Sequence, residues 1–314
     1  MNNGIAMSSP AQRTKKPKAG SARKPASGDK AACTVLYQGE PGANSHLACL
    51  KALPDMVPEA CPTFEDALAG LRQSQARYAL IPIENTVAGR VADVHHLLPS
   101  SELFIVGEHF ERIYHQLLVL PDAKLEELKT VHSHTHALGQ CRGVIRELGL
   151  KPVTEADTAG AARMLAEERD VTKAVIASKL AAETYGLRIL RSNIEDAEHN
   201  TTRFITLSAE SDEAPSGNGP VITTFIFRVR NVSAALYKAL GGFATNGVNM
   251  TKLESYMVGG AFTATLFYAD IEGHPEDRAV QLALEECRFF SSEFRVVGVY
   301  PASSFRAEQR EKSA

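Results

Sequence analysis

Short β-rich runs alternate with helical stretches along residues 34–186. The hydrophobic pattern predicts buried strands over 34–37, 78–81, 103–106, 116–120, 131–133 and 174–177. It predicts helices over 44–52, from Thr63 onward, over about 137–148 and 158–168, and in a segment ending near 185–186. Thr63 and Asp66 form a pair typical of a capping box at a helix start. This alternation implies an α/β fold in which helices cover parallel sheets.

A second pattern begins after a polar, turn-rich segment at 210–220. It predicts, in order, a strand over 221–229, a helix over 233–246, strands over 249–256 and 262–271, a helix over 275–287 and a strand over 295–300. This βαββαβ order is typical of a ferredoxin-like module. We therefore expect a larger domain at 33–212, a smaller α+β domain at 221–301, and tails at 1–32 and 302–314.

Composition narrows the class of protein. A chain of 314 residues with 44% hydrophobic and 23% charged residues is typical of a soluble two-domain protein, and excludes a mainly disordered, collagen-like or coiled-coil one. No run approaches the roughly 18–20 apolar residues of a membrane helix. The N-terminus also lacks the charged-then-apolar pattern of a secretory signal. The five scattered cysteines predict free thiols in a reducing compartment, and hence a cytoplasmic location.

Charge is unevenly distributed along the chain. The first 30 residues carry a net charge of +6, so the remainder carries −9. Because this first segment has few large apolar residues, we expect it to be disordered. A nucleic-acid-binding arm and an organelle transit peptide both stay open for it. The acidic body argues against nucleic acid as the main ligand, since phosphate contacts dominate that affinity.

Two polar clusters follow predicted strands of the larger domain. Residues 39–45 (GEPGANS) lie between a strand and a helix, where glycines let the backbone approach a ligand and free N–H groups favour an anion. Any tight turn would use the same glycines. Glu84, Asn85 and Thr86 stand at the carboxyl end of a buried strand, where ligands gather in open α/β sheets. The alternative is that they cap a helix or a turn.

A third cluster contains alternating histidines. His132, His134 and His136 would share one face of a strand, a spacing that could hold zinc with neutral imidazoles. No carboxylate partner stands at a fixed spacing from them. Strand-to-helix junctions also use Ser, His and Thr as caps, so a structural role is the alternative.

The fourth cluster is the segment 200–204 (NTTRF). Arg203 offers a planar fork for a carboxylate, and the neighbouring Thr202 can donate a proton or a hydrogen bond. The alternative is a strand start with a salt-bridged arginine. The sequence contains no pattern of a serine or cysteine triad, and neither a G-x-G-x-x-G nor a GK[ST] fingerprint for nucleotides.

Read together and in order, these clusters resemble the motifs of the prephenate dehydratase family. That family has a GPxGTFS-like turn, PIENS, SHPQALxQC, a TA-x-AA helix start, YGL and N-x-TRF. The corresponding segments here are 39–45, 82–86, 133–141, 158–162, 185–187 and 200–204, and the resemblance covers about 34–300. This chain departs from the pattern at Ala43-Asn44 for Thr-Phe, at Thr86 for Ser, and at Thr135-His136 for Pro-Gln.

The smaller domain is similar to an ACT domain. Its P-G-A-L motif stands here as SAAL at 233–236, and its E-S-R-P motif as ESYM at 254–257. Loss of that arginine and proline concerns effector recognition more than catalysis. About 33 residues precede the larger domain, too few for the helical chorismate mutase fused to some relatives, so we expect a monofunctional chain.

The resemblance implies a periplasmic-binding-protein-like catalytic domain, with two α/β lobes and the site in the cleft between them. Prephenate would lose CO2 and water to give phenylpyruvate in phenylalanine biosynthesis. Aromatisation drives that reaction, so neither a metal nor a cofactor is expected. Thr202 would donate a proton or hydrogen bond to the C4 hydroxyl, with Arg203 as a nearby positive charge. The expected lining is Asn44, Ser45, Glu84, Asn85, Thr86, Ser133, Thr158, Asn200 and Phe204.

The resemblance also implies feedback by L-phenylalanine, bound between two ACT modules. The expected effector residues are Ala234, Ala235, Leu236, Asn249, Glu254 and Ser255. Because Tyr256 and Met257 are bulkier than the usual pair and uncharged, we expect inhibition with altered affinity or ligand range. A homodimer or homotetramer is expected. Two other functions stay open: an arogenate dehydratase, and a non-catalytic amino-acid sensor.

Overall fold

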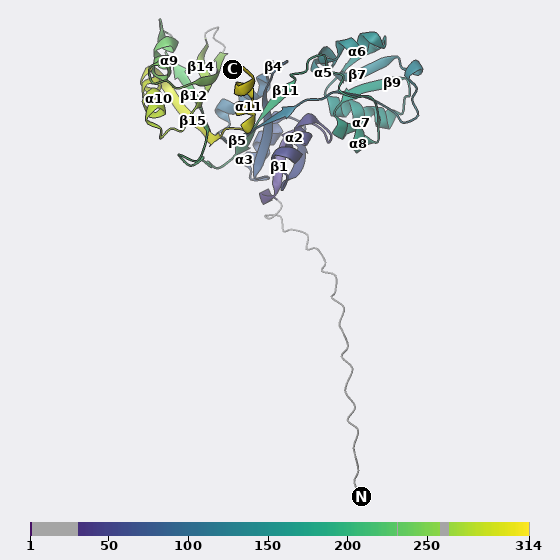
Figure 1. Ribbon diagram of the computed structural model, residues 1–314, viewed down its shortest axis with the longest axis horizontal. Coiled ribbons are helices and arrows are strands. Elements are labelled where there is room, and N and C mark those ends of the chain that lie inside the picture. Colours follow the sequence, from purple (N-terminus) through teal and green to yellow (C-terminus); the bar gives the residue numbers. More distant parts are fainter. Residues whose placement is uncertain (2–30, 231, 258–263, 314) are drawn as a thin grey trace.

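The computed structural model describes residues 1, 31–230, 232–257 and 264–313. Figure 1 shows three bodies along its long axis: a C-terminal module at the left, a first lobe in the middle and a second lobe at the right. Apart from residues 1, 31 and 32, the expected tail at 1–32 lies outside the described residues. None of the helices in the described ranges is long and apolar enough to cross a membrane.

The first lobe is built on a sheet with the strand order β2-β1-β3-β11-β5. Strand β1 runs parallel to β2 and β3, whereas β11 is antiparallel to β3 and β5. The predicted cap at Thr63 is confirmed, because its Oγ1 accepts a hydrogen bond of 3.1 Å from the Asp66 N–H. The elements are β1 (Thr34–Gln38), α2 (Asn44–Ala52), β2 (Val57–Cys61), α3 (Phe64–Arg72), β3 (Tyr78–Asn85), β4 (Gly89–Arg90), α4 (Ala92–Leu97), β5 (Phe104–Arg112) and β11 (Thr201–Ser208).

The second lobe is inserted between β5 and β11. Its sheet has the order β10-β6-β9-β7-β8, and its apolar cluster is its own. The chain therefore crosses between the lobes twice, at 113–115 and 192–200. The elements are β6 (Gln116–Val119), β7 (Thr130–His134), α5 (Thr135–Gln140), α6 (Arg142–Glu147), β8 (Lys151–Glu155), α7 (Thr158–Glu168), β9 (Lys173–Ala177), α8 (Lys179–Tyr185) and β10 (Arg188–Arg191).

The single helix expected over 137–148 is wrong, because the structure divides it into α5 and α6. The backbone of Cys141 leaves the helical region, with φ −127° and ψ 29°. The Asp196 carboxylate then accepts hydrogen bonds from the N–H groups of Arg142 and Gly143, at 2.8 and 3.0 Å. A carboxylate satisfies and electrostatically stabilises a new helix start. The break therefore depends on a residue more than 50 positions away.

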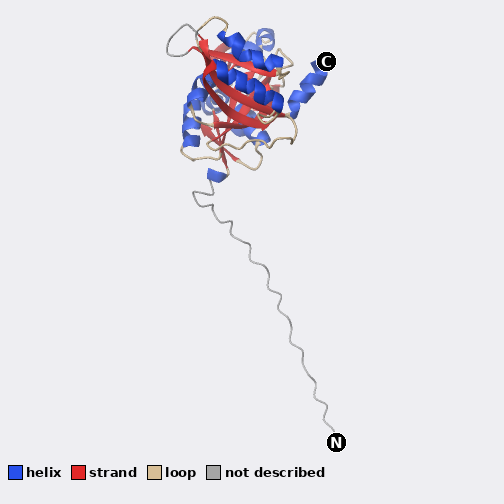
Figure 2. Cartoon of the chain, turned by 90° about the vertical axis from the view of Figure 1, so that its left-hand side faces the viewer, coloured by secondary structure: helices blue, strands red, loops and turns tan. Residues whose placement is uncertain are grey.

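The C-terminal module has the βαββαβ order expected from the sequence. Its sheet runs β13-β14-β12-β15, and Figure 2, seen from this end, shows two helices lying across one face of it. The first two positions of the expected strand at 262–271 lie outside the described residues. The elements are β12 (Val221–Val229), α9 (Ala235–Thr245), β13 (Met250–Met257), β14 (Ala264–Glu272), α10 (Arg278–Phe290) and β15 (Ser291–Pro301).

The first lobe and the C-terminal module share one sheet and one of their apolar clusters. Strand β15 joins β5 in parallel where Gly298 faces Ile105. A Cβ at Gly298 would lie 2.4 Å from the Ile105 carbonyl oxygen, so the junction requires glycine. A single apolar cluster contains Ile81 and Ile205 of the first lobe together with Tyr268 of the module. The two parts are therefore packed like the interior of one domain.

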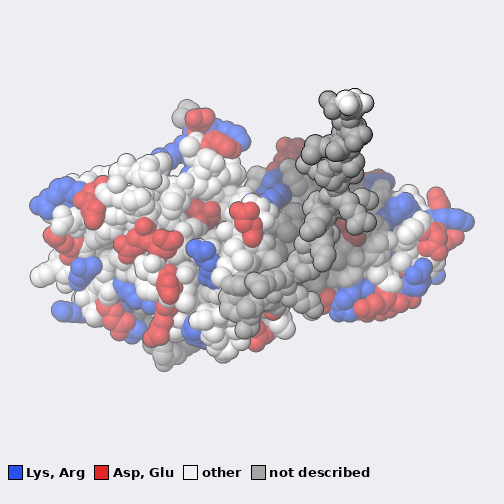
Figure 3. Space-filling model, turned by 90° about the horizontal axis from the view of Figure 1, so that it is seen from below, with Lys and Arg blue, Asp and Glu red and all other residues white. Residues whose placement is uncertain are grey.

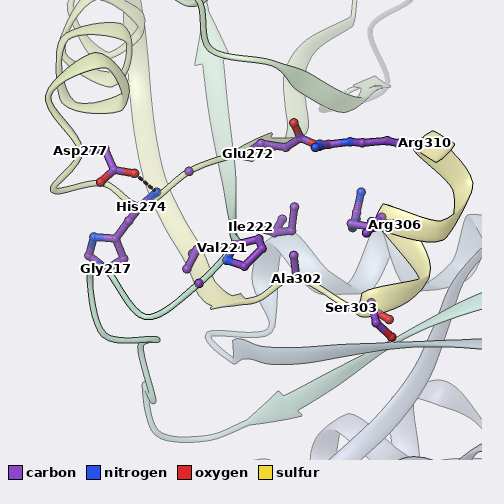
Figure 4. A pocket seen from close by; sticks show the side chains of 15 residues that line it. Gly217, Val221, Ile222, Glu272, His274, Asp277, Ala302, Ser303, Arg306 and Arg310 are labelled. Atoms are coloured by element: carbon purple, nitrogen blue, oxygen red, sulfur yellow. Dashed lines mark hydrogen bonds and ion pairs between the residues drawn. The ribbon is translucent and has the colours of Figure 1, made fainter. Parts of the chain in front are cut away.

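The expected C-terminal tail at 302–314 forms helix α11 (Ser304–Ser313). Phe305 stacks on Phe110 of β5 with ring centroids 4.6 Å apart, and Arg306 forms an ion pair with Glu108. A cavity of about 450 Å³ lies between α11, the end of β14 and the segment before β12. Figure 4 shows Arg310 of α11 reaching across this cavity toward Glu272 of β14, with which it forms an ion pair. Helix α11 thus braces the module against the first lobe.

Candidate active site

Thr202 and Asn85 meet where β11 begins and β3 ends. They are opposite each other in the pairing of β11 and β3. The Asn85 oxygen accepts from the N–H groups of Val87 and Ala88, so its amide nitrogen must be the donor on the other side. That nitrogen donates to Thr202 Oγ1 at 2.9 Å and to Asn200 Oδ1 at 2.8 Å. With its oxygen engaged as an acceptor, the Thr202 hydroxyl keeps its own proton available for donation.

A polar chain continues from this pair into the second lobe. Asn200 donates through Nδ2 to Gln140 Oε1 at 2.9 Å, and the same oxygen lies 2.7 Å from His115 Nε2. Because the Gln140 oxygen is an acceptor, the proton of His115 resides on Nε2. Burial lowers the pKa of His115, which keeps its ring neutral. The chain from Asn85 through Asn200 to Gln140 thus joins the two lobes.

Thr86 fixes the return of the chain from the second lobe. Its hydroxyl donates to the His199 carbonyl at 2.5 Å and accepts from the Thr201 N–H at 2.9 Å. The loop after β3 is thereby tied to the residues that begin β11. This tie holds Asn200 and Thr202 in place next to Asn85.

The turn at residues 39–45 touches the second lobe directly. The Gly42 carbonyl accepts from Ser178 Oγ at 2.5 Å, and the Pro41 carbonyl accepts from the Tyr185 hydroxyl at 2.8 Å. Glu40 forms an ion pair with Arg163 of α7 at 2.7 Å. Ala43, which precedes the adjoining helix α2, supplies no side-chain cap to the first N–H groups of that helix.

The chain is similar to known proteins over most of its length. The family model described as "Prephenate dehydratase" matches residues 35–212. The chain belongs to the prephenate dehydratase family. The dehydratase activity class expected from the motifs, a lyase, is thereby confirmed. So is the two-lobed α/β architecture, which solved prephenate dehydratases share.

Three relatives are especially informative. The bifunctional N-acyl-homoserine lactone acylase/prephenate dehydratase of Komagataeibacter europaeus is 51% identical over 87% of this chain and 97% of that protein. The chloroplastic arogenate dehydratase/prephenate dehydratase 1 of Arabidopsis thaliana is 35% identical over 89% of this chain and 74% of that protein. The structure of prephenate dehydratase from Arthrobacter aurescens in complex with L-Phe has a TM-score of 0.80 at 28% identity, over 86% of this chain and 90% of that one.

Arg203 and Glu84 are held in ion pairs on the face of the sheet opposite Thr202, and their expected roles in catalysis and substrate binding stay predictions. Arg203 is 3% exposed and lies on the other face of β11 from Thr202. Its guanidinium contacts Glu84 at 2.9 Å, Glu108 at 2.9 Å and Asp270 at 2.6 Å. Because neighbouring residues of a strand point to opposite sides, Thr202 and Arg203 cannot both face the same site.

Ser133 and Phe204 are buried, as Asn200 is, and their expected place in the lining stays a prediction. Ser133 is 0% exposed, and its hydroxyl donates to the Ile176 carbonyl at 2.6 Å inside the second lobe. Phe204 packs in an apolar cluster with Tyr37 and Leu80 beneath α2. Thr158 begins α7, where Asp157 caps the helix through the Gly160 N–H.

The alternating histidines have structural contacts. His132 Nδ1 lies 2.8 Å from Glu155 Oε1, and His134 caps α5 by accepting from the His136 N–H at 3.3 Å. Within the described ranges, no group of three or more His, Cys, Asp or Glu residues is arranged to hold a metal ion. These contacts support the capping interpretation of the cluster.

The expected effector residues lie at the start of α9 and along or just before β13. Ala234 precedes α9 in the left-handed region, with φ +61°, and Asn249 donates to Glu272 at 3.0 Å. Glu254 is paired with Lys252 and Arg90, whereas Ser255 is exposed.

Tyr256 lies at the contact between the module and the first lobe, and the expected change in effector affinity stays a prediction. It is buried, and its hydroxyl lies 2.6 Å from His95 Nδ1 of α4. The residue that replaces the family's arginine therefore belongs to the contact with the first lobe.

Sequence reasoning missed two members of the site. Gln140 lies inside the family motif at 133–141, and that position could have identified it from the sequence. His115 has no motif around it, and its role follows from the fold alone.

Proposed function

We propose that this chain converts prephenate to phenylpyruvate, with Thr202 as the donor to the departing hydroxyl. The observation that carries the proposal is the Thr202 hydroxyl itself. Asn85 engages its oxygen, its proton is free, and it stands where the two lobes of a family member meet. This is the geometry of a hydrogen-bond donor aimed at developing charge.

The chemistry follows from the substrate. The bond from the ring to its carboxylate breaks, CO2 leaves, and the electron pair completes the aromatic ring. The C4–oxygen bond breaks at the same time, and the oxygen departs as water after taking a proton. Thr202 supplies that proton or its hydrogen bond, and solvent restores it. Threonine is a weak acid, so the donation accelerates the reaction chiefly in a closed, dry cleft where charge is poorly screened.

The remaining lining would grip the pyruvyl end of the substrate. The uncapped N–H groups at the start of α2, near Asn44 and Ser45, suit its carboxylate. Thr158, Asn200 and Thr86 add polar contacts around the same opening. Tight holding of the ring carboxylate would slow the reaction, because it stabilises the ground state and not the transition state.

Thr202→Ala tests the assignment, with Thr206→Ala on the same strand as the matched control. We expect Thr202→Ala to lower kcat by roughly 10²–10⁴-fold, and Thr206→Ala to keep parental kcat. The assay follows the ultraviolet absorbance of phenylpyruvate formed from purified prephenate. Full activity of Thr202→Ala would reject Thr202 as the donor.

Arogenate is the alternative substrate, since plant relatives are named for it. It carries an amine where prephenate has a ketone. Measurement of kcat/KM for both compounds decides between them. A preference for arogenate above about tenfold, which corresponds to about 1.4 kcal/mol, would replace prephenate as the proposed substrate. If neither substrate is converted, a non-catalytic amino-acid sensor becomes the favoured function.

We also infer that 33–212 is the catalytic domain and that 221–301 is an ACT domain that binds L-phenylalanine. The support is the L-Phe complex of the Arthrobacter relative. A substrate titration at several phenylalanine concentrations, with tyrosine for comparison, tests it. Identical curves throughout would leave the module without a sensing role.

A homodimer or homotetramer is part of the same proposal. Large apolar side chains are exposed on the C-terminal module, among them Tyr237 and Phe289 at 79%. Strand β13 is also an open sheet edge. Both features favour pairing with a second copy. A monomer at all concentrations in light scattering would reject it.

The reaction is placed in the cytoplasm, in keeping with five free cysteines. Nucleic acid is not among the proposed partners. On the face seen in Figure 3, acidic and basic side chains of the described residues are intermixed instead of forming a basic patch.

A second activity, N-acyl-homoserine lactone hydrolysis, is favoured by one observation. The relative whose name includes it is 51% identical across 97% of its length. Incubation with an N-acyl-homoserine lactone, with release of homoserine lactone measured by mass spectrometry, tests it. Absence of release would reject this activity and leave the dehydratase proposal untouched.

A further inference from the structure

Strands β3 and β11 present two different pairs of side chains on their two faces. Their register places Thr202 opposite Asn85 and Arg203 opposite Glu84. The first pair meets on one face of the sheet at 2.9 Å, and the second meets on the opposite face, also at 2.9 Å. Because consecutive residues share a rigid backbone, a shift of the second pair displaces the first.

The second pair is anchored in the C-terminal module. Arg203 contacts Asp270 of β14 at 2.6 Å and the Tyr300 hydroxyl of β15 at 2.9 Å. Thr224 of β12 donates to the other Asp270 oxygen at 2.6 Å. A buried arginine held by this many charge-assisted bonds has one arrangement and not several.

Lys252 of β13 completes the anchoring from the edge of the module. Its Nζ lies 2.7 Å from Glu84 Oε2 and 3.2 Å from Glu254 Oε1, and its side chain is 8% exposed. Each Glu84 oxygen therefore binds one cation, Arg203 at Oε1 and Lys252 at Oε2. Burial alone would raise the pKa of Glu84, but Lys252 and Arg203 outweigh it and lower that pKa. The carboxylate is thus ionised and fixed at both ends.

The strand that carries Lys252 also carries expected effector residues. Glu254 and Ser255 follow it on β13, and Asn249 directly precedes the strand. Strand β13 is an edge of the ten-stranded sheet, yet it reaches β3 and β4 because the two parts curl around a common core. The Arg90–Glu254 ion pair at 3.4 Å marks the same contact. One lysine therefore links the edge of the module to the residue next to Asn85.

We propose that Lys252, acting through Glu84, is a positioning residue for the Asn85–Thr202 pair, and that it carries the state of strand β13 to the candidate active site. The proposal rests on the proposed function of that site. It makes the C-terminal module a part of the catalytic geometry even without an effector.

The test compares Lys252→Met with Lys173→Met and Lys252→Arg. Lys173 is the matched control, a half-buried second-lobe lysine paired with Glu168 at 2.6 Å. The measurements on the full chain are kcat and KM for prephenate, with and without L-phenylalanine, and amide hydrogen exchange of peptides covering 79–86 and 199–208. Lys252→Met should lower kcat about tenfold with little change in KM, and exchange at 201–204 should become about tenfold faster. Lys252→Arg should restore both, and Lys173→Met should match the parent.

Several results would overturn the proposal. One is parental kcat in Lys252→Met, whatever its exchange rates, since that confines Lys252 to a structural role. Another is a fall in kcat in Lys173→Met as large as the fall in Lys252→Met. If the parent converts neither prephenate nor arogenate, the proposed function fails separately. Hydrogen exchange then decides the positioning role, and unchanged exchange in Lys252→Met rejects it.

Discussion

The first lobe meets its two neighbours by different physical means. Toward the C-terminal module it continues as one sheet, shares one apolar cluster, and buries the ion pairs of Arg203. Toward the second lobe, its Pro41 and Gly42 carbonyls accept hydrogen bonds from Tyr185 and Ser178, and Glu40 forms a part-exposed ion pair with Arg163. The second lobe keeps an apolar cluster of its own.

This difference indicates which junction moves. Separating the first lobe from the module would expose core side chains and leave buried charges unpaired, at a high cost. Separating the two lobes replaces their polar contacts with hydrogen bonds to water, which costs little free energy. We therefore expect the first lobe and the module to move as one body, and the second lobe to open and close against it. Regulation then acts within a rigid body whose strands reach the site.

The largest effect should come from breaking the charged junction. Arg203→Leu leaves Asp270 and Glu108 buried without their shared cation, which should lower the free energy of unfolding by about 3–5 kcal/mol. The control is Arg191→Leu, which removes an exposed pair with Glu147 and should cost about 0–1 kcal/mol. Urea denaturation measures both. Equal stability of the two variants would contradict the rigid junction.

The free energy of unfolding should also depend on pH through His95, which lies at the same junction. Burial, together with the charge of Lys252, lowers the pKa of His95 to about 4. In the unfolded chain its pKa is near the ordinary 6.5. The stability from neutral His95 is thus complete above pH 6.5 and is lost as the pH falls toward 4. The loss should reach about 3 kcal/mol.

Denaturation of the parent and of His95→Gln at pH 7 and pH 4.5 checks this. The parent should lose more stability than the variant between these two values. Replacement of the exposed neighbour, His96→Gln, should leave the parental pH dependence. A variant with the same pH dependence as the parent would show that His95 does not titrate as described.

Gly42→Ala should disturb the cleft junction by a smaller amount. Gly42 has φ +89°, and a Cβ there would lie 2.7 Å from the Ala181 Cα across the cleft. We expect a cost of about 1–3 kcal/mol against closure, seen as a rise in KM of roughly 5–150-fold. Gly149→Ala is the control, because it also has positive φ but nothing within 4 Å of its Cβ. An unchanged KM in Gly42→Ala would mean that closure does not require this contact.

The smallest effect should come from Tyr185→Phe, which removes one hydrogen bond to the Pro41 carbonyl. The expected cost is about 0.5–1.5 kcal/mol, measured as a modest rise in KM with unchanged thermal stability. Tyr114→Phe, at an exposed tyrosine, serves as the control. A fall in thermal stability larger than for Arg203→Leu would reverse the ranking of the two junctions.

Elements with a strong local pattern were predictable, and the edge strands of the two lobes were not. The sequence located α2, α7 and β12 at their observed bounds, because their apolar positions and caps are local. It missed β2 and β8, whose sequences VPEAC and KPVTE contain proline and mostly exposed residues. An edge strand needs few apolar side chains, so it leaves little signal.

The candidate site shows the same division. The sequence singled out Asn85, Asn200 and Thr202, which the structure joins by hydrogen bonds. It grouped Arg203 with Thr202 because the two are adjacent, whereas β11 sends them to opposite faces. A firm strand assignment at 201–208 would have separated them.

By itself, the sequence determined the α/β class, the order of elements, the family motifs and the candidate residues Asn85, Asn200 and Thr202. These depend on periodicity, caps and short motifs, all of which act within a few residues. Tertiary structure alone decided that Arg203 is held by Asp270, 67 positions away, and Glu84 by Lys252, 168 positions away. Coulombic attraction in a buried junction depends on distance in space, and the distance between two such charges is set by how the sheet curls and not by their separation along the chain.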